Sequence, residues 1–147
     1  TVVVDGAHNP QSMGVLRDAV REYLDPADTV VVFGCSGDKE LPGMAEQLAS
    51  LATHVVVCTS RHPRAVPADR VASVFEAVGV PTSHAPNVAV ALDAARQIAT
   101  ALGAIVVTGS LFVVAEALEA WQGIEPERYP ELERPTASEA KSVSGLG

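Results

Sequence analysis

Polar and charged side chains gather directly after four apolar runs of this chain, at residues 5–9, 36–39, 59–64 and 108–110. Together the four groups contain two histidines, two arginines and one of the two lysines in the sequence. Turns need glycine, asparagine or aspartate, but they do not need cationic side chains. Because cationic groups bind carboxylates and phosphates, we expect a site for an anionic ligand.

The first loop, residues 5–12, reads Asp-Gly-Ala-His-Asn-Pro-Gln-Ser. A carboxylate at Asp5 can accept hydrogen bonds from a ribose diol, and the ring of His8 can stack on a base or donate to a phosphate. Asn9 before Pro10 is typical of a helix start, and capping explains it fully. We favour a ligand-binding role for Asp5 and His8, with a plain turn and a solvated loop residue as the alternative.

The second loop, residues 33–40, reads Phe-Gly-Cys-Ser-Gly-Asp-Lys-Glu. It is not the phosphate loop GxxxxGK[ST], because Asp38 separates Gly37 from Lys39, and it is not the dinucleotide fingerprint GxGxxG. The sequence therefore supports neither a self-sufficient nucleotide hydrolase nor a typical NAD enzyme. Asp38 and Lys39 fit a functional pair and a solvated helix start equally well.

The third loop carries Arg61 and Arg64, and an arginine pair matches the carboxylates of an acidic substrate. His62 precedes Pro63, which holds it extended, so a structural role fits it equally well. In the fourth loop, capping alone accounts for Ser110, although an anion would gain from the same helix amides. No cysteine and histidine cluster has zinc spacing, so we predict no metal site.

The elements between these loops alternate regularly. Runs of β-branched residues without polar alternation predict parallel strands covered on both faces, at residues 1–4, 29–33, 55–58 and 104–107. Pro81 places a further strand, residues 80–85, at an edge of the sheet. Amphipathic helices are predicted between the strands, at residues 10–24, 41–51, 67–78, 88–102 and 111–121.

This alternation predicts an α/β fold with three layers, an open and mostly parallel sheet between helices with a Rossmann-like, doubly wound topology. In such sheets ligands bind beyond the carboxyl ends of the strands, so the four polar loops are expected to meet at one edge. In the fourth helix, the spacing predicts that Ile98 and Leu102 are buried and that Gly103 ends the helix.

The composition is that of a globular protein, since 48% of the residues are apolar and 19% are charged, which excludes a disordered chain or a coiled coil. A net charge of −8 argues against binding to nucleic acid or to an anionic membrane. No apolar run approaches the ~20 residues of a membrane span, and no signal peptide is recognisable. Cys35 and Cys58 are predicted to be reduced, buried thiols of a cytoplasmic protein.

Residues 1–124 are predicted to form one domain, followed by a tail at residues 125–147. Pro126, Pro130 and Pro135 break any helix there, and the last residues are rich in serine and glycine, so we expect a tail that is mobile beyond Pro135. The chain begins at Thr1, inside an apolar run and without an initiator methionine, which indicates a fragment of a longer protein.

The four loops, in this order, resemble the carboxyl-terminal domain of folylpolyglutamate synthase and, more broadly, the Mur ligase superfamily. The most specific element is Asp-Gly-Ala-His-Asn-Pro at residues 5–10, and residues 33–40 are similar to the family's second loop with its Asp-Lys pair. Residues 59–64 are similar to the loop that carries Asn-Pro-Arg in cell-wall ligases and holds the incoming amino acid, although His62 replaces the asparagine. The final match is residues 108–118, and the resemblance covers residues 1–121.

The resemblance implies an ATP-dependent amide ligase that activates a folate γ-carboxylate as an acyl phosphate, with ATP and Mg²⁺, before the amine of L-glutamate attacks. It also implies that the phosphate loop, the magnesium ligands and the folate pocket belong to a separate amino-terminal domain. The isolated domain is therefore expected to fold without turning over ATP. Alternatives are a dihydrofolate synthase, a cell-wall Mur ligase domain, or a non-catalytic nucleotide- or protein-binding module.

By the same resemblance, the predicted site residues divide into two sides. Asp5 holds the ATP ribose, and His8 lies against the adenine or the phosphates. The glutamate side is lined by the predicted catalytic pair Asp38 and Lys39 and by the predicted glutamate-binding residues Arg64 and Ser110. Which of Arg61 and Arg64 faces the cleft stays open at this point.

Overall fold

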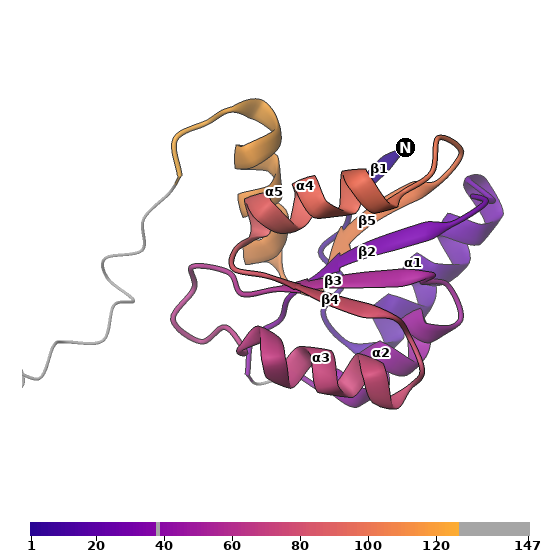
Figure 1. Cartoon of the computed structure of the whole chain (residues 1–147). Helices are drawn as coiled ribbons and strands as arrows, with labels where there is room; N and C mark the ends of the chain where they lie inside the picture. The colour runs from indigo at the N-terminus through magenta and orange to yellow at the C-terminus, as the bar shows by residue number, and fades with distance from the viewer. Residues whose placement is uncertain (38, 127–147) are drawn as a thin grey trace, which may run out of the picture.

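The computed structural model describes residues 1–37 and 39–126 of the chain (Figure 1). Asp38 lies outside the described residues, as does nearly all of the predicted tail, including Pro130 and Pro135. The predicted boundary between residues 124 and 125 stays a prediction. Within the described residues, no helix combines the length and the apolar character that crossing a membrane requires.

One sheet of five parallel strands forms the centre of the fold, and its order is β1-β5-β2-β3-β4. The strands are β1 (Val2–Val4), β2 (Thr29–Phe33), β3 (His54–Cys58), β4 (Thr82–Ala85) and β5 (Ala104–Thr108). All five residues of β2 and of β5 are buried, as continuous apolar runs require. The predicted parallel sheet is confirmed, and β4 lies at its edge, directly after Pro81.

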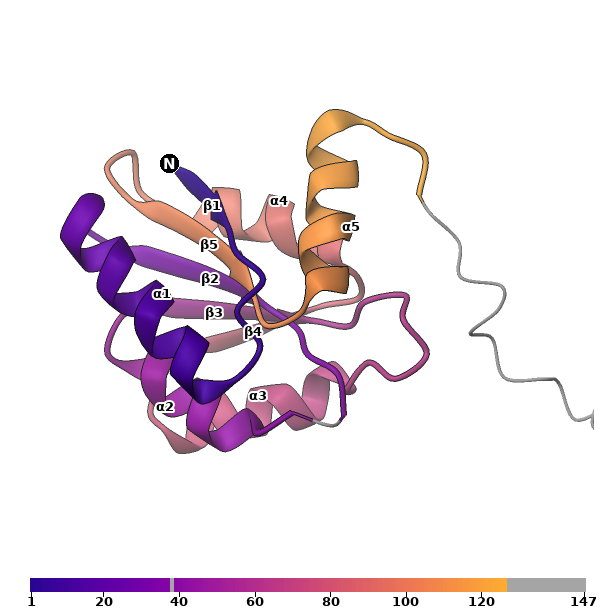
Figure 2. The same ribbon diagram turned by 180° about the vertical axis from the view of Figure 1, so that it is seen from behind.

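Two layers of helices cover the two faces of the sheet (Figures 1 and 2). Alternate strand residues divide the core, so that Val31 and Val55 pack with one layer while Val30 and Val56 pack with the other. The first layer contains α1 (Pro10–Tyr23), α2 (Leu41–Ala49) and α3 (Ala68–Ala77). The second contains α4 (Val88–Ile98) and α5 (Leu111–Gln122). The predicted three-layer, doubly wound α/β fold is confirmed.

The end of the fourth helix differs from the prediction. The helix stops at Ile98, because Ala99 adopts an extended conformation and Thr100 turns back to hydrogen-bond the Asp28 carboxylate with its hydroxyl and its N–H. Leu102 is therefore in a surface turn, 80% exposed, and Ile98 is 40% exposed. The predicted burial of both side chains was wrong, because a tertiary contact ended the helix before the pattern did.

The two cysteines are buried and are not joined by a disulfide, as predicted. Burial raises the pKa of the Cys58 thiol to about 12, and the charge of Glu116 adds to the effect. A thiol with so high a pKa stays protonated at neutral pH and is a poor nucleophile. Cys58 is therefore part of the core, where its Sγ–H points to the carbonyl of Phe33.

Candidate functional site

Hydrogen bonds between main-chain atoms tie the four polar loops to one another at the carboxyl ends of the strands. The N–H of Gly109, in the last loop, donates to the carbonyl of Ala7 in the first loop at 3.1 Å. The second and third loops pair through Gly37 N–H to Arg64 O at 2.9 Å and through Val66 N–H to Cys35 O at 2.8 Å. The loops therefore form one continuous surface.

Gly109 is the point where this surface depends on a missing side chain. Its φ is +103°, in a region that L side chains rarely adopt, and a Cβ there would lie 2.5 Å from the carbonyl oxygen of Gly34. The second and last loops can approach this closely only because Gly109 carries no side chain. The glycine thus joins loops that are 75 residues apart in the sequence.

A small hollow of about 130 Å³ lies where the loops meet, and we call it the four-loop hollow. All four loops contribute to its lining, and it contains each described residue that was assigned to the glutamate side. The lining residues are His8, Ser36, Lys39, Arg64, Ser110, Leu111 and Phe112. Two cationic side chains and an imidazole thus face one space, which suits an anionic ligand.

A larger and more open hollow of about 490 Å³, the α1 hollow, lies beside the first loop and the start of α1. Asp5 and His8 both line it, and His8 also lines the four-loop hollow. The two spaces are therefore neighbours that share one side chain. The predicted nucleotide residues and the predicted amino-acid residues consequently lie at the same edge of the sheet.

The first loop is organised by its own main chain. Asp5 accepts the N–H of Ala7 on Oδ1 at 2.8 Å, and Nδ1 of His8 lies 2.9 Å from the carbonyl of Gly6. Because a carbonyl oxygen only accepts, this bond requires the proton on Nδ1, which leaves Nε2 of the neutral ring as an acceptor. Asn9 and Ser12 form a capping box at the start of α1, so the capping role predicted for Asn9 is confirmed.

Ser110 is the N-cap of α5, and its hydroxyl oxygen accepts the N–H of Phe112 at 3.2 Å. The side chain is buried, so it belongs to the floor of the four-loop hollow. The amino-terminal end of α5 also faces this hollow, because Leu111 and Phe112 line it. The partial positive charge of the helix end therefore adds to the charges of Lys39 and Arg64.

The two arginines of the third loop have different surroundings. Arg61 points to α5, where its guanidinium lies 2.6 Å from the Glu119 carboxylate and 3.6 Å from that of Glu116. Its main-chain N–H also donates to Glu116 at 2.7 Å. Arg64 instead lines the four-loop hollow. The question left open by the sequence is thereby answered: Arg64 faces the site, and Arg61 attaches its loop to α5.

Glu116 is a residue that the sequence reasoning missed. Its side chain is 3% exposed, and burial raises its pKa, although the hydrogen bond and charge of Arg61 act in the opposite direction. A usable signal was present, because Glu116 lies on the apolar stripe of α5, three residues after the buried Val113. A carboxylate on a buried helix stripe needs a partner, and Arg61 supplies it.

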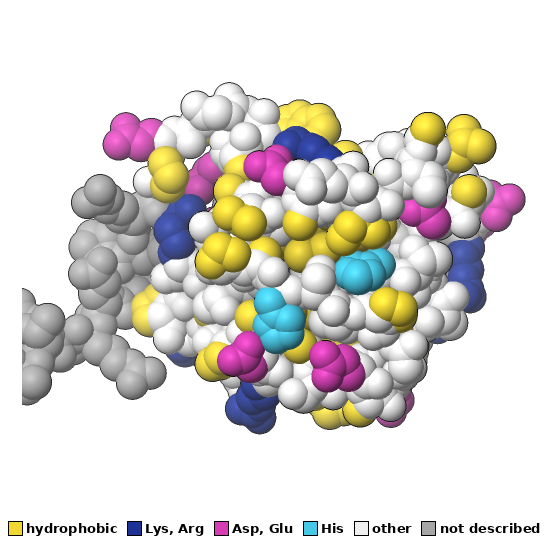
Figure 3. All heavy atoms as spheres, in the orientation of Figure 1, with side chains coloured by type: hydrophobic (Ala, Val, Ile, Leu, Met, Phe, Trp, Pro, Cys, Tyr) yellow, Lys and Arg dark blue, Asp and Glu magenta, His cyan; other side chains and the backbone are white. Residues whose placement is uncertain are grey.

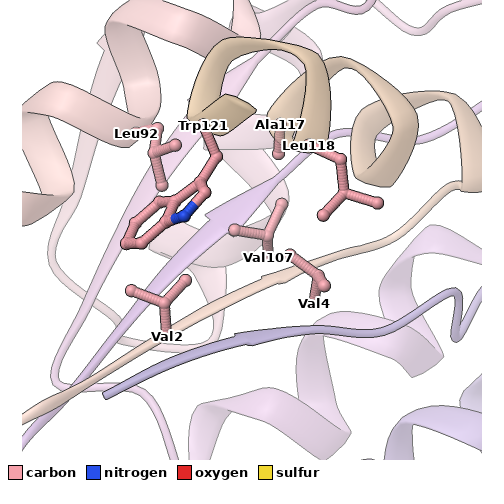
Figure 4. A pocket seen from close by; sticks show the side chains of 7 residues that line it. All are labelled: Val2, Val4, Leu92, Val107, Ala117, Leu118 and Trp121. Carbon is pink, nitrogen blue, oxygen red and sulfur yellow. The ribbon is translucent and has the colours of Figure 1, made fainter. Parts of the chain in front are cut away.

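A third hollow, of about 240 Å³, lies between β1 and α5, and Figure 4 shows its lining. Every lining residue is apolar: Val2, Val4, Leu92, Val107, Ala117, Leu118 and Trp121. Such a surface offers packing but no acid, base or anion-binding group. It also explains why Val4, at the edge of the sheet, stays 38% exposed, contrary to the expectation that its strand is covered on both faces.

A further hollow, of about 370 Å³, has Arg61, Glu116 and Glu119 among its lining residues, and there the arginine is ion-paired with both carboxylates. On the face shown in Figure 3, Lys and Arg side chains are dispersed among acidic and apolar ones. Within residues 1–37 and 39–126, no cluster of three or more histidine, cysteine, aspartate or glutamate side chains is arranged to hold a metal ion. The candidate site is therefore the pair of neighbouring hollows that share His8.

Comparison with known proteins identifies the family to which this arrangement belongs. Residues 1–111 match the family described as Mur ligase, glutamate ligase domain. This chain belongs to the Mur ligase family. The resemblance expected from the four loops is confirmed, and so is the expected Mur ligase C-terminal fold.

Individual relatives of this glutamate ligase domain include folate enzymes. The chain is 42% identical over 123 residues to a protein of Halobacterium salinarum named "probable bifunctional folylpolyglutamate synthase/dihydropteroate synthase". The match covers 82% of this chain but only 15% of that relative. A solved Mycobacterium tuberculosis folylpolyglutamate synthase, complexed with ADP and AMPPCP, is similar with a TM-score of 0.77 and 30% identity, over 86% of this chain and 30% of its own.

Cell-wall enzymes are also among the relatives. A UDP-N-acetylmuramoyl-L-alanyl-D-glutamate–2,6-diaminopimelate ligase of a Nostoc species is 37% identical over 91 residues, which is 60% of this chain and 18% of the relative. The chain thus spans a minor part of the length of each of these relatives. What those longer proteins catalyse applies to this glutamate ligase domain only as a proposal.

Proposed function

We propose that this domain binds ATP and L-glutamate for a folylpolyglutamate synthase, which joins glutamate to the γ-carboxylate of a (tetrahydro)folate. The observation that carries the proposal is the shared position of His8, which lines both the α1 hollow and the four-loop hollow. A ligase must hold its nucleotide and its amino acid close together, and these two hollows provide adjacent places for them.

The nucleotide is assigned to the α1 hollow. Its volume of about 490 Å³ is within the range of small-molecule sites. Asp5 uses Oδ1 for the turn, and among the described residues none donates a hydrogen bond to its Oδ2, which suits a ribose hydroxyl. The ring of His8 is exposed between the two hollows, where it can lie against the base or the phosphates.

The amino acid is assigned to the four-loop hollow. L-Glutamate carries two carboxylates, and the hollow offers the guanidinium of Arg64, the ammonium of Lys39 and the capped start of α5. In the proposed reaction, the neutral amine of glutamate attacks the acyl carbon, the bond from that carbon to the phosphate oxygen breaks, and inorganic phosphate leaves with the proton that the nitrogen gives up. Lys39 can stabilise the negative charge that develops on the tetrahedral intermediate. The catalytic role of Asp38 stays a prediction.

The described residues of this domain do not fit a magnesium site. Residues 1–37 and 39–126 contain no cluster of three or more His, Cys, Asp or Glu side chains that could hold a metal ion. We propose that the magnesium ligands and the folate pocket come from the remaining part of the ligase. The domain alone is accordingly expected to be inactive.

The test uses a ligase that contains the rest of the protein. Glutamate-dependent ADP release with a folate acceptor is measured for the parent, Asp5→Ala and His8→Ala. We expect each substitution to lower kcat/KM at least tenfold, equivalent to one strong hydrogen bond; His8→Ala should leave the melting temperature unchanged, whereas Asp5→Ala also removes the acceptor of the Ala7 N–H. His84→Ala, on the edge strand β4, serves as the control and should retain the parent rate. Equal rates in all four proteins would contradict the assignment of the α1 hollow.

The cell-wall relatives support a second candidate, a ligase that adds 2,6-diaminopimelate to a UDP-muramyl peptide. The same assay separates the two candidates when glutamate is replaced by diaminopimelate and folate by the peptide. ADP release that depends on diaminopimelate would replace the folate proposal. Nucleotide binding without ADP release in the presence of either amino acid and its acceptor would indicate the non-catalytic module instead.

A further inference from the structure

We infer that His62 is a positioning residue for Arg64, and that it sets where the Arg64 guanidinium stands relative to the start of α5. The inference rests on the proposed function, because it concerns the amino-acid side of that same site. His62 does not line either hollow, yet its side chain contacts a residue on each side of the four-loop hollow.

The first contact holds the main chain of Arg64. Nδ1 of His62 accepts the N–H of Arg64 at 3.1 Å, across Pro63, which has no N–H of its own. On its other side, the carbonyl of Arg64 accepts the N–H of Gly37 at 2.9 Å. Both main-chain polar groups of Arg64 are therefore held, which fixes the base of its long side chain.

The second contact holds the loop against α5. The His62 ring stacks on Phe112, with centroids 3.9 Å apart and an angle of 27° between the planes. Phe112 lies in the first turn of α5, and its N–H is capped by Ser110. His62 is only 4% exposed, so the stack is a packed contact. One imidazole thus connects Arg64 to the helix end across the hollow.

The neighbouring anchor makes this arrangement rigid. Arg61, one residue earlier, is bound to Glu116 and Glu119 on the same helix. The loop is consequently attached to α5 at two consecutive residues before it reaches Arg64. A ligand with two carboxylates, one on Arg64 and one at the helix end, would depend on this fixed separation.

The chemistry of His62 suggests two substitutions that separate its contacts. His62→Phe keeps a ring for the stack and removes the acceptor. His62→Asn removes the ring but keeps an acceptor, because Oδ1 of asparagine is as many bonds from Cα as Nδ1 of histidine. Because Nδ1 of His62 accepts a hydrogen bond, the proton of the ring is on Nε2. The Oδ1 atom of asparagine carries no proton, so it can accept the Arg64 N–H in the same way.

The experiment measures KM for glutamate, KM for ATP and kcat in the ligase that contains the rest of the protein. His62→Phe should raise KM for glutamate about tenfold, as expected from the loss of one buried hydrogen bond, and His62→Asn should raise it less. KM for ATP should stay unchanged in both. In an Arg64→Ala background, His62→Phe should have no further effect on KM for glutamate, because it acts through Arg64.

The outcomes distinguish this inference from the proposed function. An unchanged KM for glutamate in Arg64→Ala would overturn the assignment of glutamate to the four-loop hollow. A raised KM in Arg64→Ala together with unchanged values in both His62 variants would overturn only the positioning role. Equal increases in KM for glutamate and for ATP would show that His62 merely supports the core. If His62→Phe does not fold, His62→Asn and Phe112→Leu still test the stack, because each removes it and keeps an acceptor for the Arg64 N–H; an unchanged KM for glutamate in both would overturn the positioning role.

Discussion

The two hollows of the candidate site are held in place by different kinds of interaction. The α1 hollow is shaped by contacts within a few residues, such as Asp5 to Ala7 and the capping box of Asn9 and Ser12. The four-loop hollow is shaped by contacts between segments far apart in the chain, such as the bond from the N–H of Gly37 to the carbonyl of Arg64. The loop beside the α1 hollow, for which we propose a nucleotide, is thus ordered mainly by local contacts, whereas the four-loop hollow, for which we propose glutamate, forms only in the folded domain.

The largest effect on the contacts between distant loops is expected for Gly109→Ala. A Cβ at this position would lie 2.5 Å from the carbonyl oxygen of Gly34 and 2.9 Å from the Phe33 ring, at a φ of +103°. We expect the free energy of unfolding, measured by urea denaturation, to fall by about 3 kcal/mol. Gly79→Ala is the matched control, because Gly79 also has a positive φ but nothing within 4 Å of its Cβ. It should cost only about 1 kcal/mol, and equal losses would show that the close approach is unimportant.

The next effect concerns the anchor of the third loop on α5. Glu116→Ala leaves the main-chain N–H of Arg61 without its acceptor, so we expect a loss of about 2 kcal/mol in the free energy of unfolding. Glu116→Gln keeps a carbonyl oxygen for that N–H and should lose less. A loss in the glutamine variant as large as in the alanine variant would mean that the charge pair with Arg61, rather than the hydrogen bond, holds the loop.

Glu116 also predicts a dependence of stability on pH. Burial raises its pKa above the ordinary 4.5, so the folded state binds this proton more tightly than the unfolded chain does. The stability that it contributes is therefore present below pH 4.5 and lost as the pH rises through the raised pKa. The free energy of unfolding of the parent, minus that of Glu116→Gln, should fall over this range. A flat difference between pH 4 and pH 8, in roughly the range where such a carboxyl titrates, would contradict the burial effect.

The smallest effects on the free energy of unfolding are expected for residues of the first loop, beside the α1 hollow. Asn9→Ala removes the side-chain cap of α1 and should cost about 1 kcal/mol. His8→Ala should change the free energy of unfolding by less than about 0.5 kcal/mol, since the side chain is exposed. Thermal and urea unfolding of the two variants measure both values. A larger loss for His8→Ala than for Asn9→Ala would mean that the α1 hollow, too, depends on contacts beyond the loop.

Much of this protein was determined by local sequence. Runs such as Val30–Val32 bury both faces of a strand, and Asn9 and Ser110 cap their helices, so the layers, the parallel sheet and the helix starts followed from short-range chemistry. The family resemblance followed from four motifs in a fixed order. The predicted burial was wrong where a contact between distant residues intervened. Thr100 hydrogen-bonds Asp28, so the helix ends early and Leu102 is exposed to solvent.

Only the tertiary structure decided which residues face one another. Arg61 and Arg64 are identical in type and three residues apart, and although the family resemblance favoured Arg64, the residue types themselves did not exclude Arg61. Glu116, which lies 55 residues after Arg61, accepts the main-chain N–H of Arg61 and so attaches it to α5. The N–H of Gly37 instead holds the main chain of Arg64 at the four-loop hollow. The physical reason is that a buried carboxylate must find a partner wherever the fold brings one, and that choice depends on distances through space rather than along the chain.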